Sequence, residues 1–138
     1  MTSVLALAPP PVATGRTLYR AMSPAEESGP ALGDEDLGVR VPTDIRPDAA
    51  GEVGSGGRGM SVAPDDPSNL HPHHRPRSLG GTGTKPVWSL MQARVNGDLC
   101  FTLTALRHGV IAPNRTMALS TYIAALCRTQ PDWTLHHA

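Results

Sequence analysis

The sequence lacks the features that mark several large protein classes. No window of its 138 residues reaches the roughly 18 apolar residues of a membrane-spanning helix, so we expect no membrane partner. Its two cysteines, Cys100 and Cys127, show no CxxC spacing and are interpreted as small apolar side chains, with a disulfide as the alternative if the protein is exported. The length excludes a large multi-domain enzyme, and the many glycines and prolines exclude a long coiled coil.

A net charge is also lacking, but the zero hides a division along the chain. Residues 1–66 hold five basic and ten acidic residues, whereas residues 67–138 hold seven basic and two acidic residues. The basic residues of the second half are scattered, and only Arg75, Arg77 and Lys85 lie near one another. The pattern excludes a wholly basic nucleic-acid binder and predicts no specific nucleic-acid interface.

The beginning of the chain lacks a secretory signal. The apolar run within residues 1–8 is too short for such a signal and has no basic flank. We therefore expect a protein that is cytoplasmic in the cell that makes it, without a signal peptide. This localisation is compatible with delivery to another cell by a route that needs no leader.

Glycine and proline, at 14 residues each, divide the chain into short segments. Apolar or alternating runs between them predict a series of strands at 17–22, 60–63, 86–90, 99–103 and 110–113. A weaker edge strand is predicted at 37–41. One helix is predicted over 117–128, with Thr116 as its N-cap, because four apolar residues share one face: Leu119, Tyr122, Ile123 and Leu126.

These elements predict a small α+β domain with a mostly antiparallel β core, long Gly/Pro loops and one C-terminal helix. The domain is expected over residues 16–133. Residues 1–15 are predicted to be a disordered tail, since they end in a proline run without periodicity. Residues 134–138 are predicted to be a disordered end.

Two clusters invite a ligand but favour a structural interpretation. The glycine run 54–59 is not followed by the Lys-Ser/Thr of a phosphate loop, and Pro64 prevents the helix that either nucleotide motif needs. His71, His73 and His74 resemble a metal cluster, but the prolines around them favour an exposed loop. We therefore expect no metal site, with metal binding by these histidines as a minor alternative.

Two single residues are candidates for a site. Arg20 ends an apolar strand, where a guanidinium is either exposed to water or clamps a diphosphate or carboxylate. His108 precedes the apolar Val110-Ile111 run, where a strand emerges from a loop, and is either structural or an acid/base group. Glutamate is absent after Glu52, so hydrolysis by a carboxylate pair lacks obvious residues.

The order of three short motifs is informative. Leu18-Tyr19-Arg20-Ala21 is followed by a glycine run closing on Gly59-Met60-Ser61-Val62 and then by His108-Gly109-Val110-Ile111-Ala112-Pro113. This order, over residues 16–130, resembles the small type VI secretion toxins whose domain is ADP-ribosyltransferase-like. The resemblance implies a split sheet that holds NAD as substrate without a metal, release of nicotinamide, and transfer of ADP-ribose to a macromolecular target or to water.

The resemblance also implies roles for particular residues. The catalytic set would be Arg20, Ser61 and His108, with Arg20 on the diphosphate, Ser61 on the nicotinamide ribose and His108 as a positioning or acid/base group. Tyr19 or Trp88 would supply the aromatic surface that completes NAD binding, with Tyr122 less suited because it lies on the core face of the helix. A cognate immunity protein would be a further partner.

The sequence departs from this family in two ways. Met60 stands beside Ser61 where the family presents a polar pair, and the glutamate that the family places late in the domain is missing. The alternative is therefore a non-catalytic protein-interaction module, in which the acidic residues 26–52 and the basic residues 75–115 contact each other or a partner.

Overall fold

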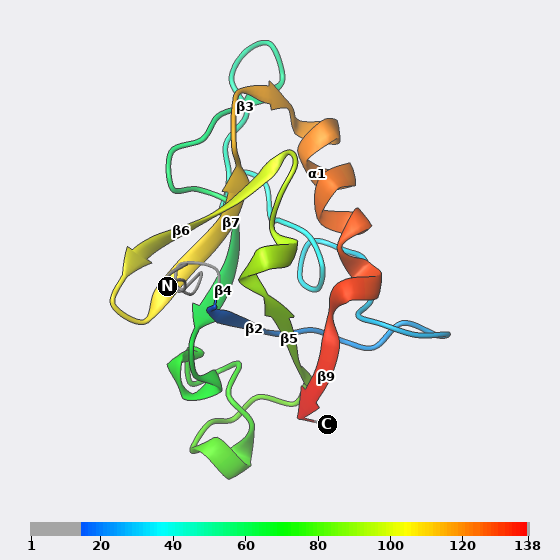
Figure 1. Ribbon diagram of the computed structural model, residues 1–138, viewed down its shortest axis with the longest axis vertical. Helices are drawn as coiled ribbons and strands as arrows, with labels where there is room; N and C mark the ends of the chain where they lie inside the picture. The colour runs from blue at the N-terminus through cyan, green and yellow to red at the C-terminus, as the bar shows by residue number, and fades with distance from the viewer. Residues whose placement is uncertain (1–14, 138) are drawn as a thin grey trace, which may run out of the picture.

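A computed structural model describes residues 15–137 of the chain. Its main feature is a six-stranded antiparallel sheet in the order β6-β7-β4-β2-β5-β9, partly covered by one α-helix (Figure 1). The strands are β2 (Thr17–Ala21), β4 (Met60–Pro64), β5 (Val87–Met91), β6 (Leu99–Ala105), β7 (His108–Pro113) and β9 (Thr134–His137). The predicted small α+β fold with a mostly antiparallel sheet and a C-terminal helix is confirmed.

The remaining elements are short. A second sheet pairs β3 (Glu52–Val53) with β8 (Met117–Ala118), and β8 leads directly into the helix α1 (Leu119–Arg128). Single turns of 3-10 helix lie in the connections: η2 (Pro67–Asn69), η3 (Arg77–Leu79), η4 (Gln92–Arg94) and η5 (Gln130–Asp132). Within the described part of the chain, no helix is long and apolar enough to cross a membrane.

The main sheet is divided where β2 meets β4. These strands pair at only two positions, Leu18 with Pro64 and Tyr19 with Ala63, whereas β2 pairs with β5 along its whole length. In Figure 1, β2 runs nearly horizontally and β4 nearly vertically, so the two strands separate soon after they meet. The separation opens the sheet at the ends of β2 and β4 that carry Arg20 and Ser61.

Alternation along the strands places two apolar clusters on opposite faces of the sheet. Leu18 and Met60 belong to the main core, which α1 covers with Tyr122 and Leu126. Tyr19, which follows Leu18 and therefore points to the other face, packs in a smaller cluster with Ala63 and Val87. Most of the apolar surface that folding removes from water thus lies beneath α1.

Tyr122 joins the helix to the sheet through its hydroxyl group. Met60 and Ile111 are register partners at the end of the β4–β7 ladder, and the Tyr122 hydroxyl lies between their backbones. It accepts a hydrogen bond from the Met60 N–H at 3.0 Å and donates one to the Ile111 carbonyl. Gly59 has a φ of +155°, and a Cβ there would lie 2.5 Å from the Tyr122 oxygen. Burial raises the pKa of Tyr122 above its ordinary value.

The C-terminal end of the domain corrects one prediction. Residues 134–137, expected to be disordered, form β9 and pair with β5, since Leu135 is opposite Trp88 and Thr134 opposite Ser89. The ring of His136 also packs edge-on against Tyr19 at a centroid distance of 4.9 Å. Apart from Gly15, which is described and exposed, the tail predicted over 1–15 lies outside the described residues.

Three local predictions are also wrong. Residues 37–41 form no strand, because Leu37 makes only an isolated bridge with Leu32. The helix begins after Ala118 rather than at a Thr116 cap, because Met117 and Ala118 are extended and paired with β3. Ile123 is 36% exposed, so the apolar face of α1 is narrower than its spacing suggested.

Replacing Tyr122 with phenylalanine tests the hydroxyl bridge. Tyr122→Phe leaves the Met60 N–H and the Ile111 carbonyl without their buried partner, so we expect the free energy of unfolding to fall by about 2 kcal/mol. Urea denaturation followed by circular dichroism measures the change. Tyr19→Phe is the control, because the Tyr19 hydroxyl has no hydrogen-bond partner in the described part of the chain. Equal stability of the two variants would contradict the bridging role.

Candidate active site

A cavity of about 610 Å³ lies where β2 and β4 separate. Its floor is formed by the ends of β2 and β4 and by the beginning of β7. One wall is the loop 34–44 and the other is the loop 69–85. Charged and polar residues dominate the lining, which includes Arg20, Asp34, Glu35, Arg40, Asp44, Ser61, Asn69, His71, His73, His74, Thr84, Lys85 and His108. The three residues predicted to be catalytic, Arg20, Ser61 and His108, therefore line the same cavity.

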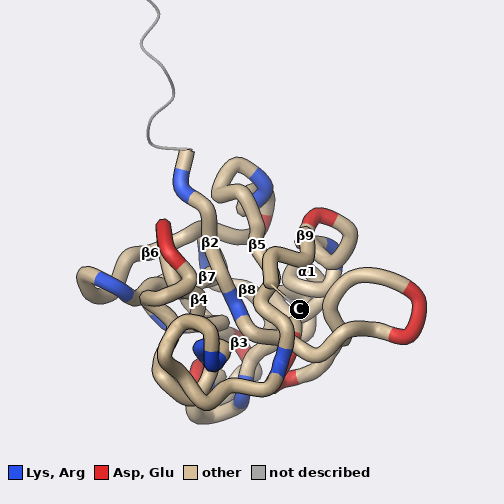
Figure 2. The backbone as a smooth tube through the Cα atoms, turned by 90° about the horizontal axis from the view of Figure 1, so that it is seen from below, with Lys and Arg blue, Asp and Glu red and all other residues tan. Residues whose placement is uncertain are grey.

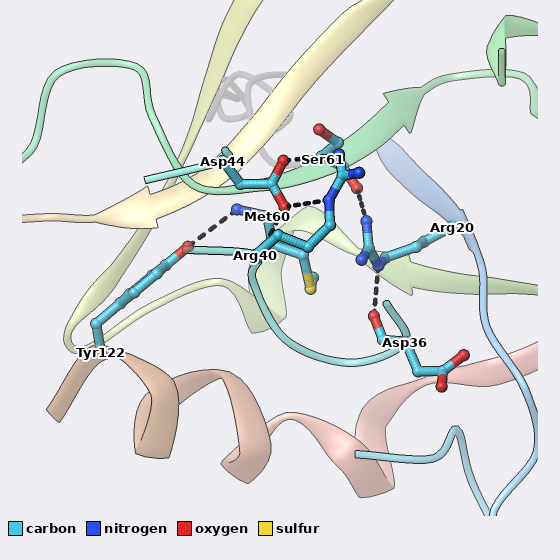
Figure 3. A network of polar contacts seen from close by, with 7 residues as sticks. All are labelled: Arg20, Asp36, Arg40, Asp44, Met60, Ser61 and Tyr122. Atoms are coloured by element: carbon cyan, nitrogen blue, oxygen red, sulfur yellow. Dashed lines mark hydrogen bonds and ion pairs between the residues drawn. The ribbon is translucent and has the colours of Figure 1, made fainter. Parts of the chain in front are cut away.

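Arg20 spans the gap between the separated strands. Its Nε donates to the backbone carbonyl of Asp36 and its Nη1 to the backbone carbonyl of Ser61, both at 2.7 Å (Figure 3). Burial lowers the pKa of Arg20 to about 10, against the opposing effect of Asp44, so the guanidinium stays charged at neutral pH. No carboxylate within residues 15–137 forms an ion pair with it. Arg20 therefore brings an unneutralised positive charge to the cavity.

The backbone of Ser61 is accessible because the β2–β4 ladder ends before it reaches this residue. Since Tyr19 pairs with Ala63, the next hydrogen-bonded pair of a continued ladder would join Ala21 to Ser61. The strands have separated by that point, and the Ser61 carbonyl accepts from Arg20 instead. The Ser61 side chain lies on the face opposite Met60, in the lining of the cavity. The split thus exposes both a backbone segment and a hydroxyl group to a ligand.

His108 reaches the same face from β7. Its neighbour two residues on, Val110, pairs with Ser61, so alternation places His108 and Ser61 on one face of the sheet. The Thr104 hydroxyl donates to the His108 carbonyl at 3.2 Å and lies 2.6 Å from Nδ1. When the hydroxyl gives its single proton to the carbonyl, Nδ1 donates to Thr104, and the neutral ring then has an unprotonated Nε2, which is the form a general base requires.

The loop 34–44 supplies carboxylates that sequence reasoning did not place at the site. Asp34, Glu35 and Asp44 all line the cavity. Asp44 is neutralised by Arg40, which forms a two-point contact with it at 3.0 and 3.2 Å (Figure 3). Asp34 and Glu35 are exposed, and their carboxylates have no hydrogen-bond partner among the described residues. Two free negative charges therefore face the cavity from one wall.

An ion pair joins the two walls. Lys85, from the loop 69–85, contacts the Asp36 carboxylate at 2.9 Å and the backbone carbonyl of Glu35 at 3.1 Å. Burial would raise the pKa of Asp36, but hydrogen bonds from the Ser23 N–H and from Lys85 outweigh it and hold the pKa below its ordinary value. The walls are thus held together by the charged form of Asp36.

Three histidines line the other wall of the cavity. The rings of His71 and His73 are stacked at 4.8 Å, and the ring of His74 is edge-on to His71 at 6.4 Å. Burial and the positive charge of Arg20 lower the pKa of His74, which is therefore neutral at neutral pH. Over residues 15–137, no group of three or more histidine, cysteine or acidic side chains is arranged to hold a metal ion.

The predicted aromatic residues do not reach the cavity. Tyr19 packs with Val87 and Ala63 in the smaller apolar cluster and is only 8% exposed; Ala63 lines the cavity but Tyr19 does not. Trp88 is buried in the main core, where its indole N–H donates to the Met22 carbonyl at 2.8 Å. Neither Tyr19 nor Trp88 therefore lines this cavity, and the rings that one of its walls offers belong to histidines.

The folded chain redistributes the charge that the sequence divides into two halves. In Figure 2, acidic and basic positions are interspersed around the domain rather than separated. At the cavity, Asp34 and Glu35 from the acidic half face Lys85 and His108 from the basic half. Comparison with models of known families, with characterised proteins and with solved structures found no match. A function for this chain is therefore inferred from the residues that line the cavity.

Asp36→Asn tests the ion pair that joins the walls. Because folding lowers the pKa of Asp36, the stabilisation it provides is complete above its ordinary value of 3.8 and is lost as the pH falls through the lower native value. We expect the variant to be roughly 1 kcal/mol less stable than the wild type at about pH 7, and the difference to shrink as the pH is lowered from about 4 to about 2. Urea denaturation at these pH values measures this difference.

Asp34→Asn is the matched control for that experiment. The Asp34 carboxylate is exposed and forms no ion pair in the described part of the chain, so its loss should leave the free energy of unfolding within about 0.5 kcal/mol of the wild type. A difference between wild type and Asp36→Asn that persists unchanged in acid would show that the charge of Asp36 does not hold the walls together.

Proposed function

We propose that this chain is an ADP-ribosyltransferase-like toxin domain that binds NAD in the cavity between β2 and β4. The reaction breaks the bond between the nicotinamide nitrogen and C1′ of its ribose, and the electron pair leaves with nicotinamide. An acceptor nucleophile or water then bonds to C1′ and gives up a proton. The observation that carries this proposal is the convergence of Arg20, Ser61 and His108 on one cavity at a split in the sheet.

Arg20 is suited to hold the diphosphate. A diphosphate needs a cation that no protein carboxylate has neutralised, and within the described residues Arg40 and Lys85 each contact an aspartate while Arg20 contacts only carbonyls. The guanidinium is also fixed in position, so its orientation costs little entropy when a ligand binds. The cavity volume of about 610 Å³ lies in the range of small-molecule and cofactor sites.

The free carboxylates of Asp34 and Glu35 offer the negative charge that the reaction needs. Loss of nicotinamide leaves positive charge on the ribose, and a carboxylate beside it stabilises that transition state. The sequence has no glutamate after Glu52, which left this role without a residue. In the fold, the loop 34–44 brings carboxylates to the cavity from the first half of the chain. They support catalysis despite the missing late glutamate.

His108 is suited to accept the proton of the attacking nucleophile. Its Nδ1 is occupied by Thr104, which leaves Nε2 as the free nitrogen of a residue that lines the cavity. The Ser61 hydroxyl, on the same face, offers a hydrogen bond to a ribose hydroxyl. Arg20 and Ser61 are thereby assigned to the diphosphate and a ribose of NAD, and His108 to the attacking nucleophile.

Calorimetry and nicotinamide release test the proposal. Purified wild-type protein should bind NAD and release nicotinamide, measured by chromatography of the reaction mixture. His108→Ala should lower the release rate by about a hundredfold with little change in NAD affinity, because the base acts only in the reaction. Arg20→Ala should weaken NAD binding by at least about tenfold, because a charge-assisted contact to the diphosphate is lost.

Controls separate a lost site from a lost fold. His137→Ala and Arg46→Ala remove the same side-chain types at positions outside the cavity lining and should leave both measurements unchanged. Arg20→Lys retains the charge and is expected to bind NAD better than Arg20→Ala. A wild-type protein that neither binds NAD nor releases nicotinamide would overturn the proposal and favour a non-catalytic interaction module. In that alternative the acidic residues 26–52 and the basic residues 75–115 contact each other, and among the described residues Lys85–Asp36 is the one ion pair that joins them.

A further inference from the structure

We propose that the free edge of β6 binds an extended, acidic segment of a partner protein by strand addition. β6 is the outermost strand of the six-stranded sheet, paired only with β7 within residues 15–137. In Figure 1, the β6–β7 hairpin projects from the domain on the side away from α1. β6 adjoins the NAD site proposed above, because Thr104 contacts His108, but the inference does not depend on that function.

The β6 edge has only one of the features that normally protect an edge strand from pairing, the β-bulge between Leu103 and Ala105. Its seven residues, Leu99–Ala105, contain no charge, no proline and no glycine. They consist of apolar, β-branched and aromatic types that favour extended structure. Free edges in soluble proteins usually carry lysine, proline or a covering segment, because an unprotected edge pairs with other chains. The composition of β6 is therefore that of a strand that receives a partner.

The hydrogen-bonding directions of the ladder show which groups are available. The Ser61 carbonyl points toward β2, so by alternation Val62 bonds toward β7. Val62 pairs with Gly109, so the backbone N–H and C=O groups of Gly109 point toward β4. By alternation the backbone groups of Val110 point toward β6, where Val110 pairs with Thr102. The backbone groups of Thr102 therefore point toward β7, and those of its neighbours Phe101 and Leu103 point outward.

The side chains around the edge indicate the chemistry of the partner. Leu103 is 44% exposed and Leu106, in the turn, is 85% exposed, so apolar surface accompanies the free backbone groups. Arg107 follows in the same turn and is exposed. A Cβ at Gly57 would lie 3.9 Å from the Thr104 side chain, so the loop that carries Arg58 runs beside β6. No acidic residue occurs between 99 and 131.

The exposed Arg107 and the absence of acidic residues from 99 to 131 favour an acidic partner. A second copy of this chain is the competing occupant, because antiparallel pairing of two β6 edges would place the Arg107 turn of each copy beside the Asp98 end of the other. A segment that alternates apolar and acidic residues would cover Leu103 and Leu106 and pair with Arg107 and Arg58. Strand addition supplies the main-chain hydrogen bonds, and the charges select the partner.

Two synthetic peptides test the proposal with the full chain. One alternates valine with glutamate and the other alternates valine with lysine, each about nine residues long to match a strand. Fluorescence anisotropy at low salt measures their binding. We expect the glutamate peptide to bind at least about tenfold more tightly than the lysine peptide, with the difference reduced by added salt. Equal affinities, or no binding of the glutamate peptide, would overturn the proposal.

Variants locate the binding surface. Leu103→Pro removes an outward N–H without removing a bond to β7 and should abolish peptide binding. Arg107→Glu changes only an exposed turn residue and should weaken the glutamate peptide by about tenfold, so the test survives if the proline variant fails to fold. Arg77→Glu, an exposed arginine of η3, is the matched control and should change nothing.

Sedimentation of the chain alone tests the competing occupant. We expect a monomer whose mass is the same in Leu103→Pro. A dimer that Leu103→Pro dissociates would show that the edge receives a second copy, and the acidic-partner proposal would then be wrong. Loss of NAD binding in Arg20→Ala has no bearing on these results, since Arg20 does not touch β6.

Discussion

The hydrogen bonds of the Arg20 guanidinium replace the part of the β2–β4 ladder that the fold leaves open. A sheet that separates after two pairs exposes backbone groups that need partners. Arg20 satisfies the Ser61 carbonyl on one side of the gap and the Asp36 carbonyl on the other. It therefore fixes the width of the cavity and the position of the acidic loop with the same side chain that is offered to a ligand. Arg20 thus has both a structural role and a role in the proposed function, and this explains why a charged side chain stands at the end of the apolar strand β2.

Much of the fold follows from local patterns in the sequence. Apolar runs bounded by glycine and proline locate β2, β4, β5, β6 and β7 to within two residues, since short strands depend on local alternation and on the turns that end them. The helix α1 follows from its apolar spacing. β9 was missed because its residues show little apolar character, and only the edge of β5 and the ring of Tyr19 give them partners.

The candidate site was predictable only in part, because distant segments build it. Arg20, Ser61 and His108 could be proposed from three short motifs, and all three line one cavity. The carboxylates of Asp34 and Glu35 could not, because they lie in a loop without regular structure whose position depends on Arg20 and Lys85. Tyr19 and Trp88 do not line the cavity for a related reason: each neighbours Arg20 in sequence or register, but their rings pack in the two apolar clusters.

The Tyr122 hydroxyl between β4 and β7 has a consequence for how the sequence can vary. A Cβ at residue 59 would lie 2.5 Å from the phenol oxygen and equally close to the Ile111 carbonyl oxygen, and the φ of +155° disfavours any residue other than glycine. Loss of the phenol at 122 would therefore not allow a side chain at 59, whereas a tyrosine at 122 requires glycine at 59. Over evolutionary time, glycine at 59 should therefore persist in descendants of this fold even where the tyrosine has been replaced.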